Sequence, residues 1–112
     1  MVNLVNLTPH PITVLNDSGE VVLRVPPSGK VARVAVKRVK IGDVNGIPLY
    51  RVKYGKVENL PPPRDGTLYI VSLLVLQACR DRKDLIAPDT SPASAVRDAS
   101  GKIVGVKAFT TL

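Results

Sequence analysis

The sequence predicts a single α+β domain over residues 1–112, built mainly of antiparallel β-strands and hairpins with one short buried helix. Short runs of β-branched residues alternate with Gly, Pro, Asn and Asp, a pattern typical of strands joined by turns. Three of these turns, at residues 16–19, 45–46 and 98–101, have the composition that closes hairpins. Only residues 73–79 have apolar spacing that favours a helix. No repeat or linker divides the chain.

Two short hairpins are expected near the ends of the chain. Residues 2–7 form a first apolar strand, and residues 12–15 and 21–25 should pair across the Asn-Asp-Ser-Gly turn between them. Residues 95–97 and 102–109 should pair across Asp-Ala-Ser-Gly in the same way. These segments account for most of the expected antiparallel structure.

A third hairpin is expected in the middle of the chain. Residues 31–41 should pair with residues 47–54 across Asn45-Gly46, because both turn residues tolerate the positive φ of a type I′ turn. The apolar positions change phase near Lys37-Arg38, which predicts a bulge there. We expect four cations to share one face of this hairpin: Arg38, Lys40, Arg51 and Lys53.

The only helix is expected after a buried strand at residues 67–71. Ser72 is a suitable N-cap for residues 73–79, whose apolar side chains leave little polar surface, so the helix should be largely buried. Residues 80–92 are polar and contain two prolines, and we expect them to form a long loop of the kind that is often functional.

Composition restricts the class of protein. The 112 residues are 45% hydrophobic and 22% charged, enough of both for an independent fold. Cys79 is the only cysteine, so no intramolecular disulfide can form and a reducing compartment is expected. No apolar run is long enough to span a bilayer and no secretory signal is visible. We therefore expect a cytoplasmic protein with no membrane partner.

The positive charge is concentrated in the middle of the chain. The net charge is +7, and residues 24–64 hold ten basic and two acidic residues against six basic and seven acidic elsewhere. Such an excess predicts a site for a phosphate-rich ligand, either nucleic acid or a small nucleotide. The alternative is a solvated surface that only aids solubility.

No residue pattern identifies a reaction. His10 is the only histidine, and no serine lies in a nucleophile elbow, so a structural role in its Pro-flanked turn is favoured. Cys79 at the end of the apolar helix is expected to be buried rather than catalytic. Metal-ligand clusters and glycine-rich phosphate loops are absent from the sequence. We expect no enzyme, no cofactor and no metal, and a hydrolase ranks last.

The aromatic residues weaken the prediction of a nucleic-acid site. Single-strand binders stack bases on aromatic rings, and only Tyr50, Tyr54, Tyr69 and Phe109 are available. Tyr50 and Tyr54 alternate with Arg51 and Lys53 along one strand, so we expect them on the opposite face from these cations. No helix carries a basic stripe for the major groove of a duplex.

Several segments carry a resemblance to a known family. Asn6-Leu7-Thr8-Pro9-His10-Pro11-Ile12, Pro27-Ser28-Gly29-Lys30, Val57-Glu58-Asn59-Leu60-Pro61, Tyr69-Ile70-Val71-Ser72 and Val96-Arg97-Asp98 resemble a family of small phage and prophage proteins. By type, the chain also resembles viral anti-defence sponges, which oligomerise and hold cyclic nucleotides or ADP-ribose-derived immune signals without cleaving them. The resemblance implies a location in the host cytoplasm.

The first predicted function is therefore a non-catalytic binder that sequesters an anionic nucleotide-type small molecule. The phosphates would contact Arg33, Arg38, Arg51 and Lys53. Further polar contacts would come from Thr8, His10, Asp89, Thr90 and Arg97. The alternatives are a nucleic-acid-binding phage accessory protein and a structural or interaction module. A homo-oligomer is expected, because a small sheet leaves strand edges unpaired.

Overall fold

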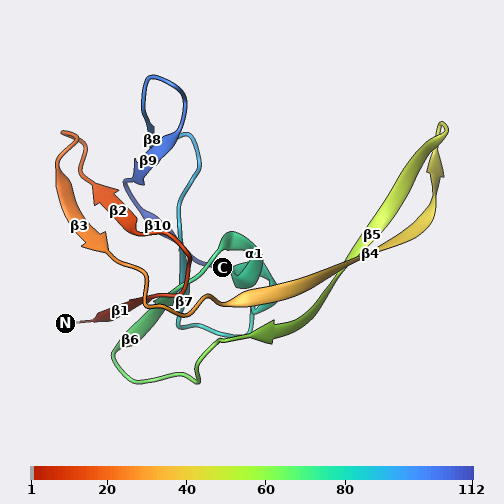
Figure 1. Cartoon of the computed structure of the whole chain (residues 1–112), viewed down its shortest axis with the longest axis horizontal. Helices are drawn as coiled ribbons and strands as arrows, with labels where there is room; N and C mark the ends of the chain where they lie inside the picture. The colour runs from red at the N-terminus through yellow and green to blue at the C-terminus, as the bar shows by residue number, and fades with distance from the viewer. Residues whose placement is uncertain (1) are drawn as a thin grey trace.

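The computed structural model describes residues 2–112, and in that range the chain forms ten strands and one short helix (Figure 1). The β-rich character and the single helix agree with the predicted fold class. In chain order the elements are β1 (Asn3–Asn6), β2 (Ile12–Leu15), β3 (Val21–Val25), β4 (Arg33–Val44), β5 (Ile47–Glu58), β6 (Thr67–Ile70), α1 (Leu73–Ala78), β7 (Leu85–Pro88), β8 (Ala95–Arg97), β9 (Ile103–Val106) and β10 (Phe109–Thr110).

The main core lies between α1 and a four-stranded sheet of order β1-β6-β7-β10. β1, β6 and β7 are parallel and β10 is antiparallel to β7. Leu85 and Ala87 of β7 are fully buried in this core. The prediction of a loop over residues 80–92 is therefore wrong for β7. A strand that is paired on both sides and covered by a helix needs only a few apolar residues. The four residues of β7 are too short a run to be recognised as a strand from the sequence.

The helix begins and ends close to the predicted residues. The Ser72 hydroxyl caps it by accepting a hydrogen bond from the Val75 backbone N–H at 3.3 Å. Val75 and Leu76 face the core, whereas Leu73 and Leu74 are 48% and 40% exposed. The helix is therefore buried along one face only, and the expectation of a largely buried helix was too strong.

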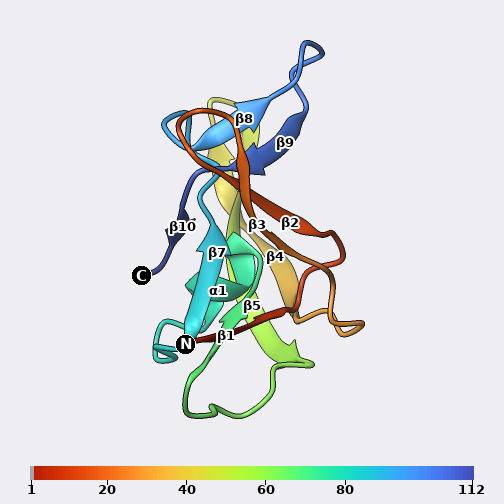
Figure 2. The ribbon, with the colours of Figure 1, turned by 90° about the vertical axis from the view of Figure 1, so that its left-hand side faces the viewer.

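In a second sheet, of order β3-β2-β9-β8, strands β8 and β9 lie above β1 of the first sheet in both views (Figures 1 and 2). It joins the hairpins β2–β3 and β8–β9 through a parallel contact between Val14 and Val106. Gly105 allows this contact, because a Cβ there would lie 3.0 Å from the Thr13 carbonyl oxygen. The pairing of β2 with β9 is parallel, like those of β1 with β6 and of β6 with β7, and the sequence indicated none of them.

β4 and β5 form a two-stranded arm that projects away from both sheets (Figure 1). The strands have 12 residues each, longer than predicted, and the molecule extends 49 × 39 × 23 Å. Only the base of the arm meets the core, through the partly buried Val34 and Val57. At the tip, Asn45 and Gly46 have φ values of 51° and 82°, as a type I′ turn requires.

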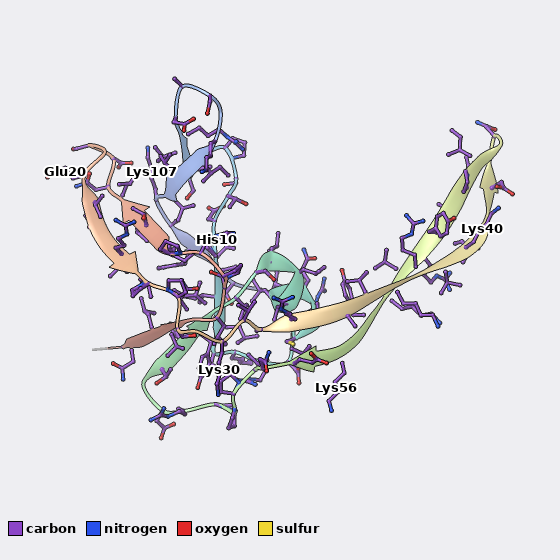
Figure 3. All side chains as sticks on the ribbon, in the orientation of Figure 1. His10, Glu20, Lys30, Lys40, Lys56 and Lys107 are labelled. Carbon is purple, nitrogen blue, oxygen red and sulfur yellow. The ribbon has the colours of Figure 1, made fainter. Side chains whose placement is uncertain are left out.

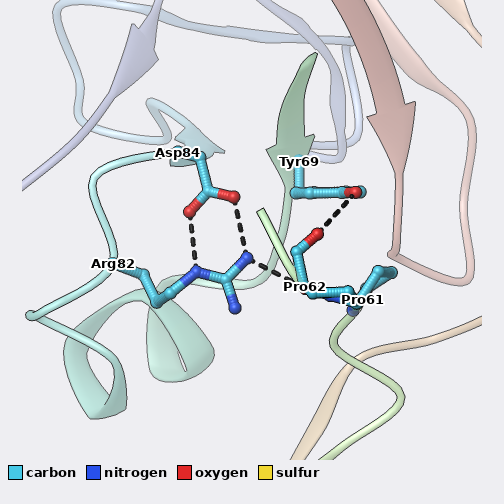
Figure 4. A network of polar contacts seen from close by, with 5 residues as sticks. All are labelled: Pro61, Pro62, Tyr69, Arg82 and Asp84. Carbon is cyan, nitrogen blue, oxygen red and sulfur yellow. Dashed lines mark hydrogen bonds and ion pairs between the residues drawn. The ribbon is translucent and has the colours of Figure 1, made fainter. Parts of the chain in front are cut away.

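Polar contacts fix the chain where it leaves the arm (Figure 4). The Arg82 guanidinium donates to both oxygens of Asp84, at 2.8 and 2.7 Å, and to the carbonyl oxygen of Pro61 at 2.9 Å. The Tyr69 hydroxyl donates to the carbonyl oxygen of Pro62 at 3.2 Å. The proline segment after β5 is thus held against β6 and the loop before β7.

Candidate nucleic-acid interface

The arm carries most of the exposed positive charge of the central segment (Figure 3). Seven basic residues lie on β4 and β5, against Asp43 and Glu58: Arg33, Lys37, Arg38, Lys40, Arg51, Lys53 and Lys56. All seven are exposed, and one of them, Lys40, lies 3.5 Å from the Asp43 carboxylate. Among residues 2–112, none of the other six forms an ion pair, so their charges can meet an anionic partner along the length of the arm.

The strand register decides which side chains share a face of the arm. Cross-strand partners point to the same side of a sheet, and the pairs Val36–Tyr54, Arg38–Val52 and Lys40–Tyr50 therefore lie together. We call this surface the tyrosine face: Val36, Arg38, Lys40, Tyr50, Val52 and Tyr54. The Arg38 guanidinium carbon lies 4.1 Å from the centre of the Tyr50 ring, a cation–π contact within the same face.

The opposite surface, the lysine face, contains the pairs Lys37–Lys53 and Val39–Arg51. The prediction that Arg38 and Lys40 share a face with Arg51 and Lys53 is therefore wrong. The expectation that Tyr50 and Tyr54 lie on the opposite face from Arg51 and Lys53 is confirmed, but β4 supplies two other cations, Arg38 and Lys40, to the side of the tyrosines. Sequence reasoning missed this combination of aromatic and basic groups.

The reason is a register shift between Lys40 and Gly42. A two-residue turn pairs Val44 with Ile47, and an unbroken ladder from there would pair Arg38 with Lys53 and Lys40 with Arg51. That arrangement would place like charges directly opposite each other, which destabilises a strand pair. The shift moves Arg38 and Lys40 opposite Val52 and Tyr50 instead. The irregularities lie between residues 40 and 42 and between 34 and 36, not at the predicted position near Lys37-Arg38.

The predicted contacts in the first turn have a structural role. The buried Asn6 amide donates to the carbonyl oxygens of His10, at 2.8 Å, and Val25, at 3.1 Å. The Thr8 backbone N–H and hydroxyl both donate to the Asn6 side-chain oxygen, at 2.9 and 2.7 Å. Thr8 is buried. His10 is exposed and contributes only its backbone carbonyl oxygen to these hydrogen bonds. These groups hold the turn between β1 and β2.

The predicted contacts near the C-terminus are also engaged locally. The Asp89 carboxylate accepts a hydrogen bond from the Ser91 backbone N–H at 3.0 Å, and this bond lowers the pKa of Asp89. The Arg97 guanidinium donates to the carbonyl oxygen of Gly101 at 2.6 Å, within the β8–β9 hairpin. Thr90 lines a hollow on the body. The three belong to β8 and to the segment between β7 and β8, and the arm projects from the body on the side away from β8 (Figure 1).

The nine predicted ligand residues are therefore not brought together. Arg38 lies on the tyrosine face, Arg51 and Lys53 lie on the lysine face, and Arg33 lies at the base of the arm. The body has two notable hollows, of about 290 and 440 Å³. The first is lined by Pro11, Ile12, Thr13, Pro88, Thr90 and Ile103–Val106, and the second by Pro63–Gly66, Leu68 and residues 81–84. The cations of the arm line neither one.

The remaining candidates for chemistry lie in the body. Cys79 is buried, and burial together with the nearby Asp81 carboxylate raises the pKa of its thiol, which disfavours the thiolate. Within residues 2–112, no three His, Cys, Asp or Glu side chains are grouped to hold a metal ion. Over the same residues, no helix has the length and apolar character needed to cross a membrane.

Comparison with known proteins adds no relative: no family, curated protein or solved structure matches this chain.

Proposed function

We propose that this protein is a non-catalytic binder of single-stranded nucleic acid and that the tyrosine face of the β4–β5 arm is its binding surface. The observation that supports the proposal is the register of the arm, which puts Tyr50 and Tyr54 on the same face as Arg38 and Lys40. Single-strand binders combine aromatic rings for the bases with cations for the phosphates. The tyrosine face contains both on one extended surface.

The spacing of the rings favours a single strand over a duplex. Tyr50 and Tyr54 are four residues apart on β5, which corresponds to about 13 Å at the usual rise of a strand. Both residues are partly exposed, at 39% and 45%. Bases stacked in a duplex are about 3.4 Å apart, so a strand that used both rings would have to be unstacked and extended. Arg38, which lies over Tyr50, adds a planar guanidinium on which a base can also stack.

A small nucleotide fits this geometry less well. Small-molecule sites are concave and enclose most of their ligand, whereas the cations of the arm lie on two open faces. A polymer gains instead from many weak contacts along an open surface, since each phosphate that is neutralised releases counterions. An accessory protein that coats or holds a single strand is the role that follows.

Fluorescence anisotropy with labelled single-stranded oligonucleotides of about 16 nucleotides, as DNA and as RNA, tests the proposal. Replacing Tyr50 and Tyr54 together by Ala should weaken binding by at least about 30-fold, because base stacking contributes about 1–3 kcal/mol for each of the two rings. Both side chains are exposed, so the fold should be retained. A duplex of the same length should bind more weakly than the single strand.

A matched pair of charge variants distinguishes direct phosphate contacts on the tyrosine face from general electrostatic attraction between the arm and the nucleic acid. Arg38→Gln with Lys40→Gln removes two cations from the tyrosine face, and Arg51→Gln with Lys53→Gln removes two from the lysine face. The first variant should reduce the slope of log K against log salt by about 1.4, because each phosphate contact accounts for about 0.7. The second should leave the slope unchanged. Equal slopes for both variants, or thermal stabilisation by small nucleotides without oligonucleotide binding, would contradict the proposal.

A further inference from the structure

The tip of the arm is apolar on its lysine-face side. Val44 and Ile47 are cross-strand partners that flank the turn, and they are 52% and 67% exposed. Leu49 follows on the same face and is 43% exposed. We call Val44, Ile47 and Leu49 the arm tip. Apolar side chains gathered at the end of a projecting element usually mark a contact with another protein surface.

The arm also lacks support within its own chain. An isolated two-stranded hairpin is marginally stable in water unless a third strand or a helix packs against it. Here α1 packs only at the base of the arm, where Val34 and Val57 meet the core. The distal half extends from the body with no other element beside it (Figure 1). A surface that covers the arm tip would therefore stabilise the whole arm.

A complementary surface exists on the body of the same chain. The hollow of about 290 Å³ between β2, β9 and the end of β7, which we call the apolar hollow, has no charged side chain in its lining. An apolar cavity of about 150 Å³ is large enough for benzene, so this hollow can receive two branched aliphatic side chains. Val104, 48% exposed, belongs to its lining.

The arm tip cannot reach the apolar hollow of its own chain. The tip lies at one end of the long axis of the molecule, and β2 and β9, which line the hollow, lie toward the other (Figure 1). The type I′ turn is closed by the directly paired Val44 and Ile47, so the tip contains no loop long enough to span that distance. Occupation of the hollow by this tip therefore requires a second copy of the chain.

We propose that two copies of this protein form a reciprocal dimer in which the arm tip of each inserts into the apolar hollow of the other. One hairpin tip offers less area than the roughly 1,000 Å² of a specific interface, and the reciprocal arrangement doubles the contact. Two-fold symmetry also closes the assembly at two subunits. The tyrosine face stays open in this dimer, since the arm tip belongs to the other face. The inference does not depend on the proposed function.

Light scattering after size exclusion tests the dimer with two single variants. The wild-type mass should be twice 12.0 kDa. Ile47→Lys in the arm tip and Val104→Glu in the apolar hollow should each reduce it to 12.0 kDa, since each puts a charge into an apolar contact. Val22→Lys and Val22→Glu are the matched controls, because Val22 is 60% exposed on the edge strand β3. Both controls should remain dimeric.

Mixing the two monomeric variants gives the decisive result. A mixed dimer contains one unmodified tip-to-hollow contact and one in which the introduced lysine meets the introduced glutamate, so dimers should return on mixing. A chain with Ile47→Cys and Val104→Cys should form a disulfide-linked dimer, whereas Ile47→Cys with Val22→Cys should not. A monomeric wild type, or a dimer that the Val22 variants break and the Ile47 and Val104 variants leave intact, would overturn the proposal.

Discussion

The contact between Arg82 and Asp84 gives a quantitative test of how the arm is anchored. Both side chains are largely buried, at 19% and 15% exposed, and the guanidinium joins the carboxylate through two bonds while also holding the Pro61 carbonyl. Pro61 follows three residues after the end of β5. Asp84→Asn keeps the size of the side chain but removes its charge and one of its two acceptor oxygens. The change should therefore leave a cation without its partner at the base of the arm.

The expected loss lies between two limits. Removing one partner of a fully buried ion pair costs about 3–5 kcal/mol, whereas an exposed pair contributes about 0–1 kcal/mol. With a small part of each side chain still in contact with solvent, Asp84→Asn should lower the free energy of unfolding by about 2 kcal/mol. The melting temperature should fall by about 10 °C. Urea unfolding followed by circular dichroism at pH 7 measures the first quantity.

The same pair predicts a pH dependence. The hydrogen bond from Arg82 holds the pKa of Asp84 below its usual value, so the folded state binds the proton less readily than the unfolded state. The stabilisation is complete above the unfolded pKa of about 3.9 and is lost as the pH falls through the lower folded pKa. The difference in unfolding free energy between wild type and Asp84→Asn should therefore shrink in acid. An equal difference at pH 7 and at low pH would refute this explanation.

Three further substitutions test the core, the first turn and the arm. Leu85→Ala should lower the free energy of unfolding by about 2–5 kcal/mol, because the side chain is fully buried in β7; chemical denaturation measures it. Asn6→Ala should cost about 1–3 kcal/mol for each buried partner left without a hydrogen bond, and the loss should be visible as a lower melting temperature. Gly46→Ala should cost about 1 kcal/mol, because φ is 82° there, and should speed amide hydrogen exchange in β4 and β5 more than in β6.

Local sequence signals predicted the elements better than their arrangement. Ser72 marked the start of the helix and Asn45-Gly46 marked the tip of the arm, because N-caps and type I′ turns depend on a few neighbouring residues. The parallel pairings of β2 with β9 and of β1 with β6 join segments far apart in the chain. No turn joins such strands, so no local residue pattern reports their pairing.

The set of side chains on the tyrosine face depends on a register shift of one residue between β4 and β5. An unbroken ladder from the turn would put four cations on one face. The irregularity between Lys40 and Gly42 places Arg38 and Lys40 on the face opposite Arg51 and Lys53. A physical signal for this was present in the sequence, since the regular register would have opposed Arg38 to Lys53 and Lys40 to Arg51. Repulsion disfavours that ladder, because it opposes two pairs of like charges where the observed register opposes one, Lys37 with Lys53. Because both faces of the arm are exposed, no apolar face fixed the register instead.

The dimer and the single-strand interface make one joint prediction when both are present. A reciprocal dimer presents two tyrosine faces, so a strand long enough to reach both would bind with a high effective concentration at the second face. Val104→Glu, which lies outside the arm, should then weaken binding of a long single strand by about 100-fold and leave binding of a short one unchanged. Anisotropy measured with both lengths distinguishes this from a direct effect on the arm. Equal weakening of both lengths would mean that the substitution disturbs the tyrosine face itself and that the two surfaces are not independent.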